Sequence, residues 1–101
     1  MNIEVLTADY NNARHATDLV YLLNSYAMDP MGGEAALPQA VQQSLASELA
    51  KIPNAFSVLC YVDNKPAGLV NCFTGFSTFK CKPLVNIHDV TVFKDFRGLG
   101  L

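Results

Sequence analysis

The hydrophobic period of this chain changes at Pro53, and that change limits the fold more than any other feature. Before Pro53, apolar residues recur three and four positions apart, which is typical of the buried face of a helix. After it, apolar runs alternate with short turn sequences, which is typical of strands. The 101 residues suffice for one small domain. The pattern predicts a mixed α/β (α+β) domain with its helices first and most of its strands afterwards.

The part before Pro53 predicts one strand and two helices. Residues 3–8 form a short apolar run, and Asp9 after it is expected to cap the first helix. That helix should end at Asp29, because a residue before proline avoids the α region. Pro38 should open the second helix, where its missing N–H costs nothing. The expected buried positions are Ala16, Leu19, Val20, Leu23 and Tyr26 or Ala27 in the first helix, and Val41, Leu45, Leu49 and Ile52 in the second.

Three strands are expected after Pro53. Residues 55–62 and 67–76 form the arms of a hairpin around the turn sequence 63–66. Residues 84–93 are rich in β-branched side chains and predict a third strand. The order is therefore strand, helix, helix and three antiparallel strands, with neither an internal repeat nor a linker in residues 1–101.

Composition excludes several classes of protein. The formal charge of −2 argues against a nucleic-acid binder, and no apolar run approaches the ~20 residues that span a bilayer. Cys60, Cys72 and Cys81 form no CxxC pair, so we expect neither a disulfide scaffold nor a metal site, and small core residues instead. The first residues lack a signal-peptide pattern, which makes a reducing, cytoplasmic setting the expectation.

The C-terminal end carries the clearest functional signal. Residues 80–101 hold four basic and two acidic side chains, so an anion would be attracted there. Gly98 and Gly100 follow a predicted buried strand directly. Glycines at such a point let the backbone approach an anion closely, most often at the start of a helix. Taken alone, the Gly-x-Gly pattern is weak and is more often an ordinary tight turn than a phosphate-binding loop.

Residues 85–101, Val-Asn-Ile-His-Asp-Val-Thr-Val-Phe-Lys-Asp-Phe-Arg-Gly-Leu-Gly-Leu, resemble the acetyl-CoA motif of the GNAT N-acetyltransferase superfamily. That motif is an apolar strand, a short link and then Gln/Arg-x-x-Gly-x-Gly/Ala. Arg97 to Leu101 fill its first five positions, and the sixth would be residue 102. The order of elements upstream is similar too. The resemblance implies that residues 1–101 are the N-terminal portion of one GNAT domain, a partial GNAT fold truncated at the pyrophosphate loop.

The resemblance also implies a cosubstrate and the residues that bind it. Acetyl-CoA would pair its pantetheine arm with the backbone of Val90, Thr91 and Val92. Its pyrophosphate would meet the loop formed by Arg97, Gly98, Leu99, Gly100 and Leu101. The loop between the helices, residues 26–34, would line the site of the acceptor amine.

Two neighbouring residues are the catalytic candidates. Residues 76–80 and the Ile87-x-Asp89 pattern resemble the diamine-acetyltransferase branch, which carries a glutamate where this chain has His88. His88 would serve as a general base and Asp89 as an acidic contact for the amine. The alternatives are a histidine bonded to a neighbour and an aspartate that accepts backbone N–H groups. Strand alternation predicts that the two side chains lie on opposite faces.

The function expected from the resemblance is transfer of acetyl from acetyl-CoA to a primary amine of a small molecule, with polyamine-like amines as one acceptor class. The family tyrosine that protonates the CoA sulfur lies beyond the motif helix, so we expect residues 1–101 alone to be inactive. The alternative is a non-catalytic GNAT remnant or interaction module, which the coding sequence after residue 101 would distinguish. We also expect a homo-oligomer formed through the strand 85–93, whose edge would be unpaired.

Overall fold

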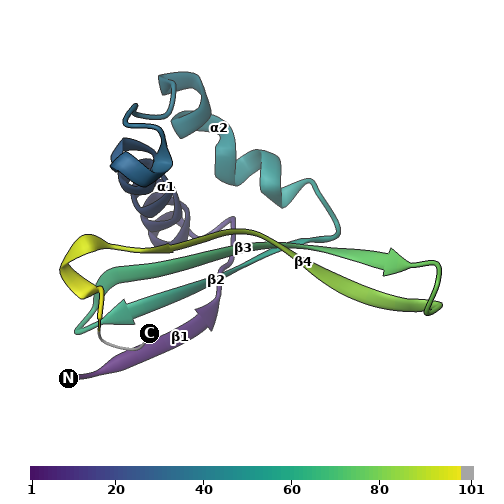
Figure 1. The fold of residues 1–101 in the computed structure, drawn as a ribbon. Helices are drawn as coiled ribbons and strands as arrows, with labels where there is room; N and C mark the ends of the chain where they lie inside the picture. Colours follow the sequence, from purple (N-terminus) through teal and green to yellow (C-terminus); the bar gives the residue numbers. More distant parts are fainter. Residues whose placement is uncertain (99–101) are drawn as a thin grey trace.

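A computed structural model describes residues 1–98 of the chain. Within that range two helices pack on one face of a four-stranded antiparallel sheet (Figure 1). The sheet order is β1-β2-β3-β4, so β1 and β4 are its edges. The predicted fold class and the predicted order of elements are confirmed. The elements are β1 (Ile3–Thr7), α1 (Ala13–Met28), the 3₁₀ helix η1 (Pro30–Gly32), α2 (Gln39–Ala50), β2 (Ala55–Val62), β3 (Lys65–Ser77), β4 (Lys82–Val92) and the 3₁₀ helix η2 (Lys94–Phe96).

The start of α1 differs from the prediction. Asn12 is the N-cap, and its side-chain oxygen accepts a hydrogen bond from the backbone N–H of His15 at 3.0 Å. Asp9 instead accepts from the backbone N–H of Asn11 at 2.9 Å. The prediction of Asp9 as the cap was wrong because residues 9–12 first close a turn, in which the N–H of Asn12 donates to the carbonyl of Asp9. The predicted end of α1 before Pro30 is confirmed, with Asp29 as the C-cap.

Two tight turns set the registers of the strands. Asp63 and Asn64 both have positive φ, 50° and 65°, as in the type I′ turn that matches the twist of a hairpin. β3 therefore begins at Lys65, two residues earlier than the predicted strand. At the β3–β4 turn, Cys81 also has positive φ and is exposed. Only Cys72 is a buried cysteine in the described range, with Cys60 half-buried, so the prediction of a core role fails for Cys81.

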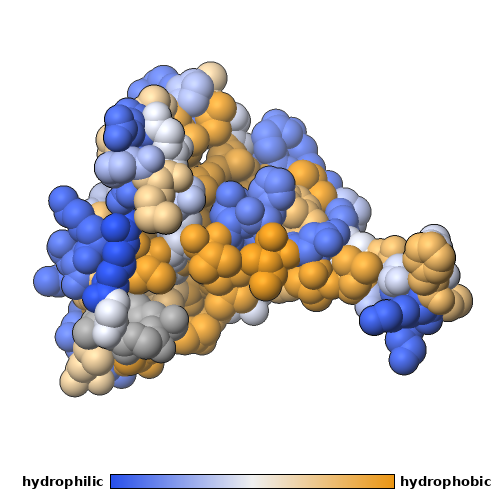
Figure 2. Space-filling model, viewed as in Figure 1, coloured by the Kyte–Doolittle hydropathy of each residue, from blue (hydrophilic) through white to orange (hydrophobic). Residues whose placement is uncertain are grey.

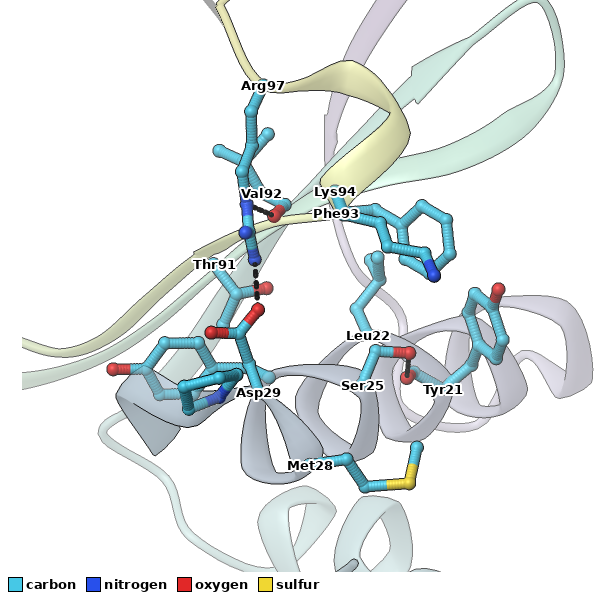
Figure 3. Close-up of a pocket in the computed structure, with 12 residues that line it drawn as sticks. Tyr21, Leu22, Ser25, Met28, Asp29, Thr91, Val92, Phe93, Lys94 and Arg97 are labelled. Carbon is cyan, nitrogen blue, oxygen red and sulfur yellow. Dashed lines mark hydrogen bonds and ion pairs between the residues drawn. The ribbon is translucent and has the colours of Figure 1, made fainter. Parts of the chain in front are cut away.

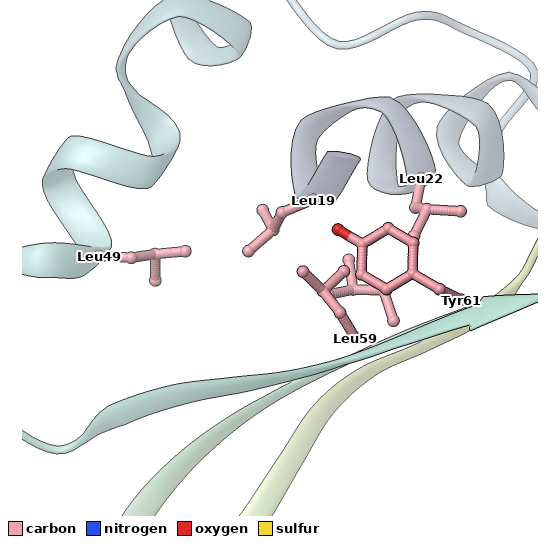
Figure 4. Close-up of a cluster of buried hydrophobic side chains, with 6 residues drawn as sticks. Leu19, Leu22, Leu49, Leu59 and Tyr61 are labelled. Carbon is pink, nitrogen blue, oxygen red and sulfur yellow. The ribbon is translucent and has the colours of Figure 1, made fainter. Parts of the chain in front are cut away.

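The core lies between the helices and the middle of the sheet (Figure 4). Its buried side chains are Leu19, Leu22, Leu49, Leu59, Tyr61 and Leu69. Val41 and Ile52, predicted to be buried, are each 38% exposed. The reason is that α2 contributes to this core only through Leu49, supported by Leu45, while α1 lies along the sheet.

The other face of the sheet and its β4 edge are apolar and open. By strand alternation, Ile87 and Val90 point away from the helices, and they are 63% and 60% exposed. Ile3 and Val5 on β1 share this face and are exposed as well. Figure 2 shows apolar residues as a band along the front of the sheet, where β4 runs in Figure 1.

We expect Leu59→Ala to lower the free energy of unfolding by about 2–5 kcal/mol, because it leaves a cavity beneath α1. Val5→Ala, a change at an exposed strand position, should alter it by no more than about 0.5 kcal/mol. Urea unfolding followed by circular dichroism measures both. Equal effects of the two changes would contradict the assignment of the core.

Candidate functional site

The free edge of β4 exposes backbone groups at alternate residues. The N–H of Phe93 donates to the carbonyl of Ala67 at 2.7 Å, so the backbone of Phe93 faces β3. In an antiparallel ladder the direction alternates, so the backbone of Thr91 also faces β3. Val90 and Val92 then direct their N–H and C=O groups away from the sheet. Three residues were predicted to pair with an extended ligand. The backbone of Val90 and Val92 faces the open edge and is suited to such pairing. The prediction fails for Thr91, because its backbone already pairs with β3.

Arg97 closes part of this edge. Its Nε donates to the carbonyl oxygen of Val92 at 3.0 Å, and its guanidinium contacts Oδ2 of Asp29 at 3.0 Å. Figure 3 shows the side chain running from the loop after β4 toward the end of α1. The guanidinium thus joins the free strand edge to the loop between the helices, although 68 residues separate the two partners of the ion pair.

Asp29 is held in place by its own loop. Its Oδ1 accepts from the backbone N–H of Met31 at 3.1 Å, which caps η1. This backbone hydrogen bond, followed by the hydrogen bond from Arg97, lowers the pKa of the Asp29 carboxyl below its usual value. Only glycine fits at position 32 of this loop, because a Cβ there would overlap the carbonyl of Tyr26. Asp29 is therefore an ionised carboxylate at neutral pH with a defined orientation.

A pocket of about 470 Å³ lies between α1, η1 and the end of β4 (Figure 3). This volume is within the range of small-molecule sites. Asp29 is the single acidic residue in its lining, and Lys94 and Arg97 are the basic ones. The lining residues are Tyr21, Leu22, Ser25, Tyr26, Met28, Asp29, Pro30, Thr91, Val92, Phe93, Lys94 and Arg97.

The hydroxyl of Thr91 is the unsatisfied polar group of this pocket. The residue is 5% exposed, and its Oγ1 has no hydrogen-bond partner among the described residues. Figure 3 shows the side chain directed from β4 toward α1. The nearby hydroxyl of Ser25 is already used, because it donates to the carbonyl of Tyr21 at 2.8 Å. A buried hydroxyl without a partner costs about 1–3 kcal/mol, so its presence in a pocket wall points to a ligand group.

A β-bulge determines where the two catalytic candidates point. Asn71 pairs with Asp89 and Cys72 with Ile87, which leaves His88 as the extra residue of β4. Asp89 accepts a hydrogen bond from Asn71, and the ring of His88 meets the ring of Phe73 edge-on at 5.6 Å. Asn71 and Phe73 share one face of β3. The prediction that His88 and Asp89 lie on opposite faces is wrong, because the bulge turns both toward the helix side.

Behind Asp89 lies a polar chain that crosses the sheet. The carbonyl oxygen of the Asn71 side chain accepts from Ser57 Oγ at 2.6 Å, and Ser57 Oγ lies 2.7 Å from the hydroxyl of Tyr10. The amide nitrogen of Asn71 donates to Asp89 Oδ2 at 3.2 Å. Since Ser57 gives its proton to Asn71, the Tyr10 hydroxyl donates to Ser57. Burial raises the pKa of Tyr10, which keeps its hydroxyl protonated as this direction requires.

The loop 26–34, expected to line the acceptor site, contributes Asp29 to the pocket wall. Sequence reasoning identified neither the contact of Asp29 with Arg97 nor the polar chain behind Asp89. Ser57 and Asn71 are polar residues inside otherwise apolar strands, and they are paired in register. That pattern was a usable signal for a buried polar network. The contact between Asp29 and Arg97 had no local signal, because it depends on tertiary structure.

The remaining predicted loop residues are partly outside the described range. Gly98 has φ 85°, a left-handed conformation that favours glycine. Leu99, Gly100 and Leu101, predicted as cofactor-binding residues, lie outside the described residues. Across residues 1–98, His, Cys, Asp and Glu form no group of three or more able to hold a metal ion. In the same range, no helix is both long enough and apolar enough to cross a membrane.

Comparison with known proteins identifies the fold. The chain matches the ribosomal-protein-alanine N-acetyltransferase of Brucella melitensis with a TM-score of 0.77 and 19% identity, over 99% of this chain and 63% of that one. It matches a GNAT family acetyltransferase of Staphylococcus aureus with a TM-score of 0.76 and 15% identity, over 99% and 69%. It matches an aminoglycoside acetyltransferase from an uncultured soil sample with a TM-score of 0.72 and 17% identity, over 97% of this chain and 60% of that one.

These matches define the class of fold to which the chain belongs. Nearly all of the chain superposes on acetyltransferases, while it spans 60–69% of the length of these three. The chain is therefore a partial GNAT fold, as the sequence motif predicted. No protein-family model matches the chain, and no curated protein matches it in sequence.

We expect Ser57→Ala and Asn71→Leu each to destabilise the fold by about 1–3 kcal/mol, because each leaves the other polar group buried without its partner. The double variant should be much less destabilised than the sum, since it removes both groups together. Chemical unfolding of the four proteins gives the coupling. Strict additivity would contradict the polar chain.

Proposed function

We propose that this chain is the N-terminal portion of a single acetyltransferase domain, which transfers acetyl from acetyl-CoA to a primary amine of a small molecule. The observation that carries the proposal is the free edge of β4, which leads through the single turn of η2 to Arg97 and Gly98 on a GNAT fold. A polyamine-like acceptor and a reducing, cytoplasmic setting belong to the proposal as predictions from the sequence.

The residues present suit such a cosubstrate. Val90 directs its N–H and C=O, and Val92 its N–H, away from the sheet along an extended edge, which is what an arm containing amides requires, while the Val92 carbonyl accepts from Arg97. Arg97 and Gly98 supply a guanidinium and a left-handed turn at the end of that edge, a combination that suits a pyrophosphate. Bound acetyl-CoA would supply a thioester. The amine nitrogen would form the new C–N bond and lose a proton, while the C–S bond breaks and the CoA sulfur leaves as a thiolate that is then protonated.

Asp89 and His88 are the proposed catalytic residues. Asp89 has the orientation that a proton acceptor needs, because Asn71 donates to one of its oxygens and leaves the other available to take a proton. His88 is exposed beside it on the bulge, where solvent reaches its ring. The two would act on the same side of the strand, in contrast to the arrangement that simple alternation predicts.

We expect the chain to bind acetyl-CoA weakly, with a dissociation constant of hundreds of micromolar, on the order of −5 kcal/mol. Val90→Pro should abolish this binding, because it removes an outward-facing N–H without breaking a bond to β3. Val5→Pro is the matched control, since the N–H of Val5 also points away from the sheet, at the β1 edge. Calorimetry measures the three affinities. Low-micromolar binding, or binding that Val90→Pro leaves unchanged, would refute the expectation.

A second candidate function is that of an interaction module. β4 is an edge strand of 11 residues, and Val85, Ile87 and Val90 along it are more than half exposed. Such an edge is a template for another strand, and a second copy offers the same edge with two-fold symmetry. We propose that the chain forms a homo-oligomer through antiparallel pairing of β4.

We expect the isolated chain to sediment as a dimer that dissociates across a roughly hundredfold dilution. Val90→Lys should make it monomeric, because a charge on the edge opposes pairing. Val5→Lys on the other edge should leave the dimer intact. Analytical ultracentrifugation distinguishes these cases. A monomer at every concentration would contradict the proposal.

A further inference from the structure

Arg97 occupies two sites at once, and each belongs to a different ligand under the proposed function. It covers the carbonyl of Val92, on the strand edge offered to the cosubstrate, and the carboxylate of Asp29, in the pocket beside α1. We propose that Arg97 masks Asp29 until a phosphate-bearing ligand draws the guanidinium away. Asp29 then binds the ammonium of a singly charged primary amine. This inference rests on the proposed function and names its order of binding, and it puts a monoamine in place of the polyamine-like acceptor predicted from the sequence.

The ion pair is suited to exchange. The side chain of Arg97 is 48% exposed, and ion pairs at such sites contribute little to stability. A pyrophosphate carries more charge and more acceptor oxygens than one carboxylate and one carbonyl, so it competes well for a guanidinium. Departure of Arg97 releases the Val92 carbonyl and the Asp29 carboxylate in the same movement.

Asp29 does not depend on Arg97 for its position. The N–H of Met31 still holds Oδ1, and Asp29 is the C-cap of α1, where the helix dipole favours a cation. The carboxylate therefore stays in the pocket wall with Oδ2 available. While Arg97 is bound, the charge of Asp29 is neutralised and Lys94 makes the pocket positive, which disfavours an amine.

The pocket also indicates the kind of amine. Its lining has one carboxylate, which can pair with one ammonium group. The further ammonium groups of a polyamine would find no carboxylate there and would be repelled by Lys94. Leu22, Met28 and Phe93 supply apolar walls for the body of the ligand, with Tyr21 stacked on Phe93 at a ring distance of 5.4 Å. The unpaired hydroxyl of Thr91 would accept an N–H of the amine.

The experiment is a titration with 2-phenylethylamine, followed by two-dimensional NMR of the chain, with and without saturating inorganic pyrophosphate at matched ionic strength. In the wild type, pyrophosphate should tighten amine binding by at least ~5-fold, with shifts at Asp29 and Thr91. Arg97→Gln should bind the amine equally well with and without pyrophosphate. Lys80→Gln, which removes a cation far from the pocket, should behave as the wild type does.

Three further results complete the test. Asp29→Asn should lose amine binding under both conditions, and Thr91→Val should weaken it while leaving the fold intact by circular dichroism. Spermidine should bind less tightly than the monoamine. The inference is overturned if pyrophosphate leaves the affinity of the wild type unchanged or weaker, if Asp29→Asn binds normally, or if spermidine binds more tightly.

The inference and the proposed function can fail separately. Coupling of amine to pyrophosphate without acetyl-CoA binding at the β4 edge would support the masking by Arg97 and refute the acetyltransferase. Binding of acetyl-CoA that Val90→Pro abolishes, with no coupling to the amine, would support the acetyltransferase and refute the masking.

Discussion

The packing of α1 across β2 and β3 is the contact on which the other features depend. Leu19 and Leu22 fill the space over Leu59 and Leu69, and this fixes the axis of the helix over the sheet. The C-terminal end of α1 is thereby placed beside the end of β4. Asp29 meets Arg97 only because of that placement, since their own loops provide no contact between them. The apolar core thus decides which charged groups share a pocket.

The edge position of β4 gives the site its second constraint. The ladder with β3 uses the backbone groups of every other residue of β4, so those of Val90 and Val92 lie in a row on the open side, where Arg97 covers only the Val92 carbonyl. The bulge at His88 ends the regular alternation just before this row. One strand therefore carries the backbone groups for an extended ligand and two polar side chains turned toward the helices. On a regular strand the neighbouring side chains of His88 and Asp89 would instead point to opposite faces.

Local patterns in the sequence predicted the elements and the fold, and failed where position depends on tertiary contacts. The turn at Asp63-Asn64, the end of α1 at Asp29 and the strand over 55–62 follow from nearest neighbours, and all three are found. Burial of Val41 was wrong because period alone does not say how far a helix lies from the sheet. The orientation of His88 was wrong because a bulge depends on the partner strand. Gly98 and Arg97 were selected by motif, whereas the partner of Arg97 required the structure.

The polar chain limits the path of a proton at the proposed site. The Asn71 amide joins Asp89 to Ser57 through two different atoms, with nitrogen donating on one side and oxygen accepting on the other. Such an amide orients the carboxylate but offers no ionisable proton to pass along. Under the proposed function, a proton that Asp89 would take from an amine could therefore not move inward to Tyr10. It would have to leave on the exposed side of the bulge, beside His88, so the buried chain would serve to position Asp89.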